Sequence, residues 1–240
     1  MIKIENFTKK YNNYIAVNNF NMLCKKGEIT GIIGPNGAGK TTILKAITGR
    51  HFGVGKITIE NHDINEDFSI IRNLTGFVVE QTELPGEYTV REYLLIKAEL
   101  HGLKKEALKN AFTDITKKCS LEDVLNFKIK TLSKGYKERL NFAQALIYNP
   151  PVLVLDEPVT GLDPSQIIQM RKLILSLKNE HTILLSTHLM QEAESLCDSI
   201  YIINKGCLVD FGTKEEICKK NNSQTLEEAY FKLIDLGDKK

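Results

Sequence analysis

No uninterrupted apolar run in this sequence approaches about 18 residues, the length typical of a membrane-spanning helix. Residues 1–5 alternate in polarity like a strand and lack the basic and apolar regions of a secretory signal. The sequence also lacks internal repeats, low-complexity tracts and coiled-coil heptads. We therefore expect a globular cytoplasmic protein, and any work at a membrane would need a membrane span supplied by another chain.

The sequence also lacks closely spaced pairs of cysteines and a large net charge. The cysteines form no C-x-x-C pair and are odd in number: Cys24, Cys119, Cys197, Cys207 and Cys218. This pattern predicts reduced structural thiols rather than a disulfide framework or a metal site.

With 32 Lys and Arg against 30 Asp and Glu, the net charge of +2 argues against nucleic acid as a partner, although it leaves room for a local basic patch. A chain of 240 residues with 42% apolar residues can bury the core of one large domain or two small ones.

The most informative segment that is present is glycine-rich. It reads Gly34-Pro35-Asn36-Gly37-Ala38-Gly39-Lys40-Thr41-Thr42, which fits the P-loop pattern G-x-x-x-x-G-K-[ST]. An apolar strand at 29–33 precedes it and a helical pattern at 42–47 follows it, as the motif requires. Backbone N–H groups of such a loop cradle phosphates, and the helix N-terminus adds partial positive charge. Lys40 is then placed to reach the β- and γ-phosphates, and the Thr41 hydroxyl to ligate Mg²⁺. The alternative, a plain strand-to-helix turn, does not account for the lysine and the hydroxyl.

The rest of the chain predicts an α/β protein with a helical insert. Strands are predicted before and after the P-loop, and helices then dominate up to a stop at Asn149-Pro150-Pro151. The predicted strands are 2–7, 15–23, 28–33, 56–60, 76–79, 152–155 and 182–186, with a turn at 53–55 and a terminal hairpin at 200–203 and 207–211. The predicted helices are 89–100, 104–118, 135–147, 164–178, 189–196 and 226–236. The near-continuous apolar strands favour a parallel sheet covered on both faces.

Two carboxylates end one of these apolar strands. Asp156 and Glu157 follow directly after Val152–Leu155. Ligands bind at the carboxyl-terminal edge of a parallel sheet, so Asp156 is placed to hold Mg²⁺, often through water, and Glu157 to polarise an attacking water. A polar turn after a strand is the alternative interpretation, and the neighbouring P-loop argues against it.

A third element, Leu132-Ser133-Lys134-Gly135-Tyr136, stands just before a predicted helix. The order of P-loop, helical insert, L-S-x-G-x and apolar strand with Asp-Glu resembles the ATP-binding cassette ATPases over essentially the whole chain. The resemblance implies a P-loop NTPase fold: a parallel-sheet core with an N-terminal antiparallel β subdomain and an inserted helical subdomain. The core would span 1–81 and 151–212, the helical subdomain 82–150, and a C-terminal helical extension 213–240. It also implies ATP hydrolysis that drives transport through a separate integral-membrane subunit.

The same resemblance implies roles for further residues. Tyr11 stands where the family has an aromatic that stacks on adenine, although a core tyrosine at a strand end is the alternative. His188 matches the histidine that contacts the γ-phosphate, and Asp163 lies in the loop, 161–163, that couples two active sites. Ser133 and Gly135 would face the ATP held by a second cassette. Two chains would then sandwich two ATP molecules as a C2 dimer, which opens after hydrolysis.

Two departures from the family pattern stand out. Lys134 and Tyr136 replace the usual Gly and Gln, and this form resembles the drug, antibiotic and lipid exporter branch, as does the segment from Leu226. The family also has a Gln that touches Mg²⁺ in the loop before the helical block. Glu80 is in register for that role and Gln81 stands beside it, and the sequence leaves both open.

The main alternative function is a soluble mechanochemical cassette protein in DNA repair or on the ribosome. Those proteins carry long coiled coils or two cassettes in one chain, and neither feature is present. A module that binds nucleotide without hydrolysis would lack the base, yet Glu157 is present. We expect a peripheral protein on the cytoplasmic face of the membrane, with a membrane subunit docked between residues 80–81 and helix 89–100. Export is the expected direction and a second copy of this chain the expected second cassette, while the transported substrate stays open.

Overall fold

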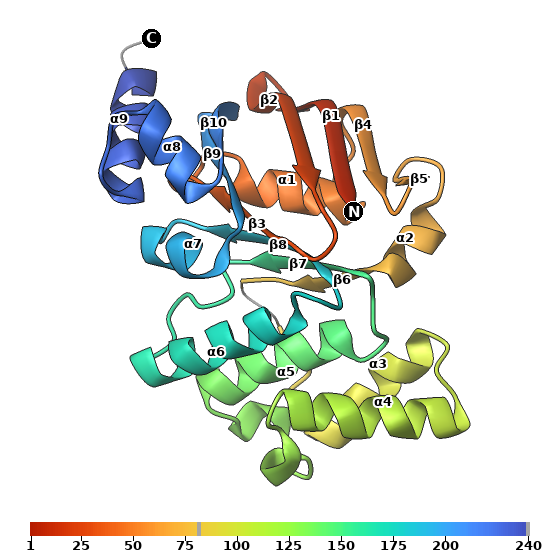
Figure 1. Ribbon diagram of the computed structural model, residues 1–240. Coiled ribbons are helices and arrows are strands. Elements are labelled where there is room, and N and C mark those ends of the chain that lie inside the picture. The colour runs from red at the N-terminus through yellow and green to blue at the C-terminus, as the bar shows by residue number, and fades with distance from the viewer. Residues whose placement is uncertain (81–82, 239–240) are drawn as a thin grey trace.

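The computed structural model describes residues 1–80 and 83–238 and contains two β-sheets (Figure 1). The smaller sheet has the order β2-β1-β4-β5 and is antiparallel. Its strands are β1 (Ile2–Tyr11), β2 (Tyr14–Cys24), β4 (Val54–Ile59) and β5 (His62–Asp63). This confirms the predicted N-terminal antiparallel subdomain.

The larger sheet has the order β10-β9-β3-β8-β7-β6 and is parallel except for its β10 edge. Its strands are β3 (Ile29–Ile33), β6 (Thr75–Val78), β7 (Val152–Asp156), β8 (Thr182–Thr187), β9 (Ser199–Asn204) and β10 (Cys207–Gly212). Every residue of β3, β7 and β8 is buried, as the continuous apolar pattern predicts for a sheet covered on both faces.

One helix, α1 (Lys40–Ile47), lies between the two sheets (Figure 1). Its apolar residues join one buried cluster with side chains of β1, β2, β4 and of the parallel sheet. Because both of its neighbours are sheets, Ile43, Leu44 and Ile47 are fully buried. The P-loop is therefore held between two rigid layers.

The helical block covers the opposite face of the parallel sheet (Figure 1). It comprises α3 (Val90–Leu100), α4 (Lys105–Lys118), 3₁₀ turns at 122–124 and 129–131, and α5 (Lys134–Leu146); α6 (Pro164–Leu177) packs beside it. A capping box of Thr89 and Glu92 begins α3, and Pro150 with Pro151 follows α5. The remaining helices α7 (Met190–Leu196), α8 (Lys214–Lys220) and α9 (Leu226–Asp238) pack near the β9–β10 edge. None of the helices within 1–80 and 83–238 is long and apolar enough to cross a bilayer.

Three local predictions were wrong or incomplete. Helices α2 (Phe68–Leu74) and α8 were missed, because each is only seven residues long and buries a single residue, Ile71 or Ile217, so neither shows an apolar face. Residues 54 and 55 belong to β4 rather than to the predicted turn. Gly55 has a φ of +113°, and a Cβ at this position would lie 2.6 Å from the carbonyl oxygen of Asn6, so glycine is needed for β4 to pass this close to β1. Strand β1 also runs on to Tyr11, and the hairpin turns at Asn12, which has a φ of +52°.

Candidate functional site

A cleft of about 490 Å³ opens at the carboxyl-terminal edge of the parallel sheet. Its walls come from the P-loop, the ends of β1 and β7 and the segment after β8. The lining residues are Tyr11, Tyr14, Ala16, Pro35, Asn36, Gly37, Ala38, Gly39, Lys40, Thr41, Thr42, Glu80, Glu157, Thr160 and His188. The structure thus brings together nearly all of the residues that the sequence places around one nucleotide.

The P-loop backbone requires glycine at its turn into α1. Gly39 has a φ of +107°, and a Cβ there would lie 2.6 Å from the carbonyl oxygen of Ala16. Any side chain would therefore strain the backbone and collide with β2. No side chain caps this end of α1, so its first N–H groups are available to phosphate oxygens.

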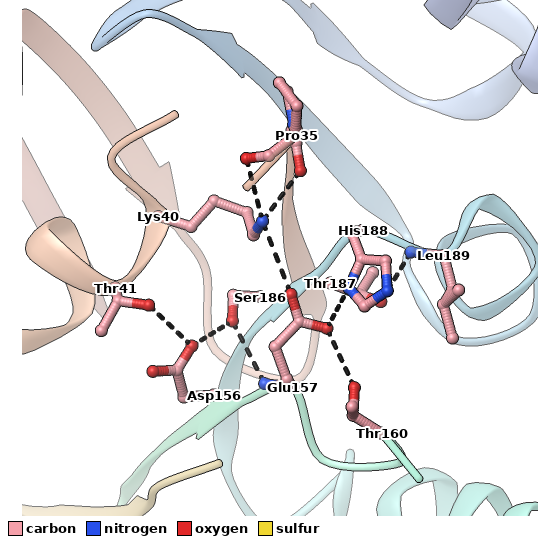
Figure 2. A network of polar contacts seen from close by, with 11 residues as sticks. Pro35, Lys40, Thr41, Asp156, Glu157, Thr160, Ser186, Thr187, His188 and Leu189 are labelled. Atoms are coloured by element: carbon pink, nitrogen blue, oxygen red, sulfur yellow. Dashed lines mark hydrogen bonds and ion pairs between the residues drawn. The ribbon is translucent and has the colours of Figure 1, made fainter. Parts of the chain in front are cut away.

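Lys40 is buried at the base of the cleft. Its Nζ donates to the carbonyl oxygens of Gly34 (2.8 Å) and Pro35 (3.3 Å) and lies 3.5 Å from Oε1 of Glu157 (Figure 2). The ammonium is thus fixed between the P-loop and the carboxylate. From this position its charge acts on any phosphate held by the loop.

Glu157 has an unusual backbone conformation, with a φ of +50° in the left-handed region. Its N–H is held by Ser186, through the carbonyl oxygen (3.2 Å) and Oγ (3.2 Å). The side chain is 8% exposed, and its Oε2 accepts from Nδ1 of His188 (2.8 Å) and Oγ1 of Thr160 (3.3 Å) (Figure 2). The carboxylate is therefore aimed into the cleft by contacts on both oxygens.

Asp156 lies beside Thr41. Its Oδ1 accepts from Oγ of Ser186 (2.6 Å) and from Oγ1 of Thr41 (3.4 Å). Burial raises the pKa of Asp156 above its ordinary value, while the two hydroxyl donors oppose that rise and Glu157 adds to it.

These oxygens fit a magnesium ion. Mg²⁺ prefers hard oxygen ligands and is commonly bound by one or two protein groups together with substrate phosphates and water. Thr41 and Asp156 supply such a pair, and no group of three or more His, Cys, Asp or Glu side chains in the described part of the chain offers a competing all-protein site.

Tyr11 is at the mouth of the cleft. Its ring is 39% exposed and meets the ring of His51 edge-on at 5.7 Å, so the alternative of a core tyrosine is wrong. Tyr14 faces Tyr11 across the hairpin turn and lines the same mouth. Tyr14 was not among the predicted site residues, although the tight turn after Tyr11 could have indicated that the two tyrosines pair across a hairpin.

A second group of predicted site residues lies outside this cleft. Ser133 caps α5, and Asp163 caps α6 through a capping box with Gln166. Gly135 adjoins Gln166, since a Cβ at this glycine would lie 2.5 Å from the Gln166 side chain. Hydrogen bonds from the Gln166 backbone and from Ser165 hold the pKa of Asp163 below its ordinary range. Ser133 and Asp163 are exposed and lie outside the nucleotide cleft of the same chain, whereas Gly135 is buried against the Gln166 side chain.

Of the two candidates in the loop after β6, Glu80 lines the nucleotide cleft. Gln81 lies outside the described residues. Ser186 and Thr160, which hold the two carboxylates, were not among the predicted site residues. Ser186 pairs directly with Asp156 between β7 and β8, so knowledge of the strand order would have revealed it.

The fold and cleft define a P-loop ATPase with an inserted helical block. The sequence profile of the ABC transporter family matches residues 17–160, which is more than half of the chain. The chain belongs to this family and is an ATP-binding, ATP-hydrolysing subunit of an ABC transporter. Subunits of this kind dimerise and work with transmembrane components.

Relatives and solved structures agree with this assignment. The chain is 38% identical over 207 residues to the Nod factor export ATP-binding protein I of Burkholderia orbicola, covering 85% of this chain and 68% of the relative. It is 32% identical over 225 residues to the ABC transporter ATP-binding protein NatA of Bacillus subtilis, covering 92% of each. A solved ATP-binding subunit of an ABC transporter superposes with a TM-score of 0.90 at 28% identity, covering 98% of this chain and 99% of that one. A dimeric cassette in a post-hydrolysis state, bound to ADP and Pi, superposes with a TM-score of 0.81 at 28% identity, covering 89% and 98%. These relatives favour transport over the DNA-repair or ribosomal alternative.

Proposed function

We propose that this chain hydrolyses Mg²⁺-ATP to drive export through a separate membrane subunit, with Glu157 as the general base. The observation that carries the proposal is the fixed position of Glu157, between Lys40 on one oxygen and His188 on the other. A carboxylate aimed at the γ-phosphate end of a P-loop is suited to accept a proton from water as it attacks phosphorus. The names of relatives such as the Nod factor exporter support the direction of transport.

In this mechanism Thr41 and Asp156 would hold Mg²⁺, with Glu80 or Gln81 as a further candidate ligand. The ion neutralises charge on the phosphates when it is bound. Lys40 and the amides of the P-loop bind the β- and γ-phosphates, and Tyr11 stacks on adenine. His188 donates to the Glu157 carboxylate and keeps it aimed at the water. The proton of the attacking water passes to Glu157, and the β–γ bridging oxygen leaves with ADP.

A second cassette, for which a second copy of this chain is the simplest candidate, would complete each site with Ser133, Gly135 and Asp163. A C2 pairing places the capped ends of α5 and α6 against the nucleotide of the partner. We propose that the pair works on the cytoplasmic face of the membrane, with no nucleic acid involved.

We further propose that the membrane subunit docks beside α3 and the loop that contains Glu80. Of the exposed carboxylates on α3, Glu92 is unsuitable for a charge-reversal test, because its side chain accepts from the Thr89 N–H (2.8 Å) in the capping box. Reversal there would weaken the helix as well as any interface. Glu99 is exposed and serves instead.

The test is recovery of the tagged full chain from detergent extracts, followed by assays of ATP turnover with and without the recovered membrane protein. We expect an integral membrane protein that stimulates turnover, and a smaller stimulation with Glu99→Lys than with the control Glu122→Lys, which lies in the 3₁₀ turn at 122–124. Basal turnover should be the same in both variants. Recovery of ribosomes or DNA without any membrane protein would contradict the proposal.

A further inference from the structure

A pocket of about 320 Å³ lies where the end of α4, the first turns of α5 and one side of α6 meet. Among the residues that the structure describes, none lines both this pocket and the nucleotide cleft, so the two sites are separate. A cavity of this size can hold a small molecule. We call this feature the α4–α6 pocket.

The charged side chains of the α4–α6 pocket are all basic. Lys118, Arg139 and Lys172 line it together with uncharged serines and glutamines, and no lining residue within 1–80 and 83–238 is Asp or Glu. Burial raises the pKa of the Cys119 thiol to about 12, and the charges of Arg139 and Lys118 oppose that rise. The positive charge therefore acts at the wall of the pocket, which favours a negatively charged occupant.

Arg139 is the group best placed to bind that charge. Its side chain is half-buried, its Nη1 donates to the Ser120 carbonyl oxygen (3.4 Å), and its Nη2 donates to Oε1 of Gln169. The guanidinium also lies over the Tyr136 ring, 5.5 Å from the centroid. These partners are uncharged, and no carboxylate in the described part of the chain forms an ion pair with Arg139. Because a guanidinium carries several N–H donors in a planar fork, it can bind a carboxylate as well.

The two lysines contribute less. Lys118 already pairs with Glu180 (3.1 Å) and Asp114 (3.5 Å), so its charge is largely compensated. Lys172 is exposed, and solvent screens its charge. Loss of Arg139 should therefore weaken an anion in this pocket more than loss of either lysine.

The rest of the wall is apolar and indicates what kind of anion fits. Cys119 and Met170 are buried, and Leu162 and Leu173 are partly buried beside them. A small hydrated anion would leave this wall in water, whereas an acid with an aliphatic body would cover it. The flexible thioether of Met170 can adapt to bodies of different shape. The pocket therefore favours an organic acid over an inorganic ion.

The α4–α6 pocket also adjoins the start of α6. Gln166 lines it, and the same residue forms the capping box of α6 with Asp163. The Gln166 side chain lies against Gly135, which lines the pocket from α5. An occupant would therefore contact residues next to the surface that we propose faces a second cassette.

We propose that the α4–α6 pocket binds a small organic acid, with its carboxylate on Arg139 and its aliphatic body against Leu162, Met170 and Leu173. This site is additional to the ATPase site, and its occupant needs neither ATP nor a membrane subunit. Binding to the isolated full chain therefore tests the inference apart from the proposed function.

Titration with octanoate, followed by NMR of isotopically labelled methionine methyl groups, tests the site. The sequence has four methionines, and Met170 lines the pocket. We expect a saturable shift of the Met170 signal, assigned with Met170→Leu, while the signal of Met22 in the core around α1 stays unchanged. Acetate has the charge without the body, and 1-octanol has the body without the charge. Each should bind at least ~10-fold more weakly than octanoate.

Arg139→Gln should weaken octanoate binding ~10-fold, because it removes a charge-assisted pair with the carboxylate. Lys137→Gln removes the same charge from α5 outside the pocket, so this matched control should bind as wild type does. Arg139→Lys keeps the charge without the planar fork and should be intermediate.

Ser176 supplies a test that leaves Arg139 in place. It is exposed and lines the pocket, so Ser176→Glu should fold normally and weaken octanoate binding about fivefold by repulsion of like charges. Ser176→Gln has a side chain of the same size without the charge and should bind almost as wild type does.

If octanoate causes no saturable shift of the Met170 signal, or binds no better than 1-octanol, the inference is wrong and the proposed ATPase function still stands. Unchanged affinity in both Arg139→Gln and Ser176→Glu has the same meaning.

Discussion

Two helix N-terminal surfaces of this molecule are built in opposite ways: the P-loop end of α1, and the ends of α5 and α6, which we propose face the nucleotide of a second cassette. At the P-loop, α1 begins without a side-chain cap, and buried Lys40, Asp156 and Glu157 converge on the opening. At the second surface, Ser133 and Asp163 cap α5 and α6 with their own side chains. The first surface leaves its amides to a ligand inside one chain, whereas at the second surface the side chains of Ser133 and Asp163 each accept one backbone N–H of their helix. If a second cassette completes the site as proposed, one chain carries a complete nucleotide cleft but only half of a catalytic site. Variants at the first surface should therefore alter isolated chains, and variants at the second should alter only the assembled pair.

The largest effect is expected from Glu157→Gln. The amide retains the shape of the side chain but cannot accept the proton, so turnover should fall by ~10²–10⁴-fold while ATP binding persists. Steady-state phosphate release and the mass of the ATP-bound species measure both outcomes. Glu180→Gln, on the surface after α6, is the control. If Glu157→Gln hydrolysed ATP at the wild-type rate, the general base would be another residue, and His188 would be the next candidate.

Lys40→Ala should weaken ATP binding by the isolated chain on the order of 100-fold, because it removes a buried cation from phosphates and leaves Glu157 without that partner. Titration with a fluorescent ATP analogue measures the affinity. Lys45→Ala, one turn further along α1 and partly exposed, should bind almost as wild type does. Equal ATP affinities of the two variants would mean that Lys40 does not bind the phosphates.

Ser133→Asp separates the second surface from the first. Aspartate caps a helix as well as serine does, so α5 should stay intact, but its charge would face phosphates across the dimer. We expect turnover to fall ~10-fold or more, with ATP affinity of the isolated chain unchanged. Ser133→Asn keeps the cap without the charge and should retain most of the turnover. A loss of affinity in the monomer would mean that this surface contacts the nucleotide of its own chain.

Tyr11→Ala should lower ATP affinity by about 2–12-fold, the loss of one aromatic stack of ~0.5–1.5 kcal/mol. Tyr11→Phe keeps the ring and should bind like wild type, and a similar loss in both variants would point to the hydroxyl instead. Competition by ADP and by other nucleotides measures the preference for adenine.

The smallest effect concerns pH. The pKa of Asp156 is raised, so acidification protonates it earlier than an ordinary aspartate, and Mg²⁺-dependent ATP binding should weaken as pH falls through that raised value. Ser186→Ala removes a hydrogen bond that lowers this pKa, so the pH at which Mg²⁺-dependent ATP binding is lost on acidification should rise. The shift is checked by measuring, at each pH, the Mg²⁺ concentration that gives half-maximal ATP binding. If the pH dependence is the same in Ser186→Ala and wild type, Asp156 is not a ligand of the metal.

These expectations were only partly visible in the sequence. The P-loop, the two carboxylates and the helical insert could be predicted because each is a local pattern with a local physical cause. Ser186 and Thr160 could not, since they meet Asp156 and Glu157 only through strand pairing and a folded loop.

The backbone of Glu157 has one further consequence. A non-glycine residue at a φ of +50° costs free energy of order 1 kcal/mol or more, and here the strain falls on the proposed base. Glycine would relax that backbone strain, but it would also leave the buried Lys40 ammonium without its carboxylate partner and remove the acceptor for His188 and Thr160. The same contacts that aim the carboxylate therefore also hold the strained backbone in place.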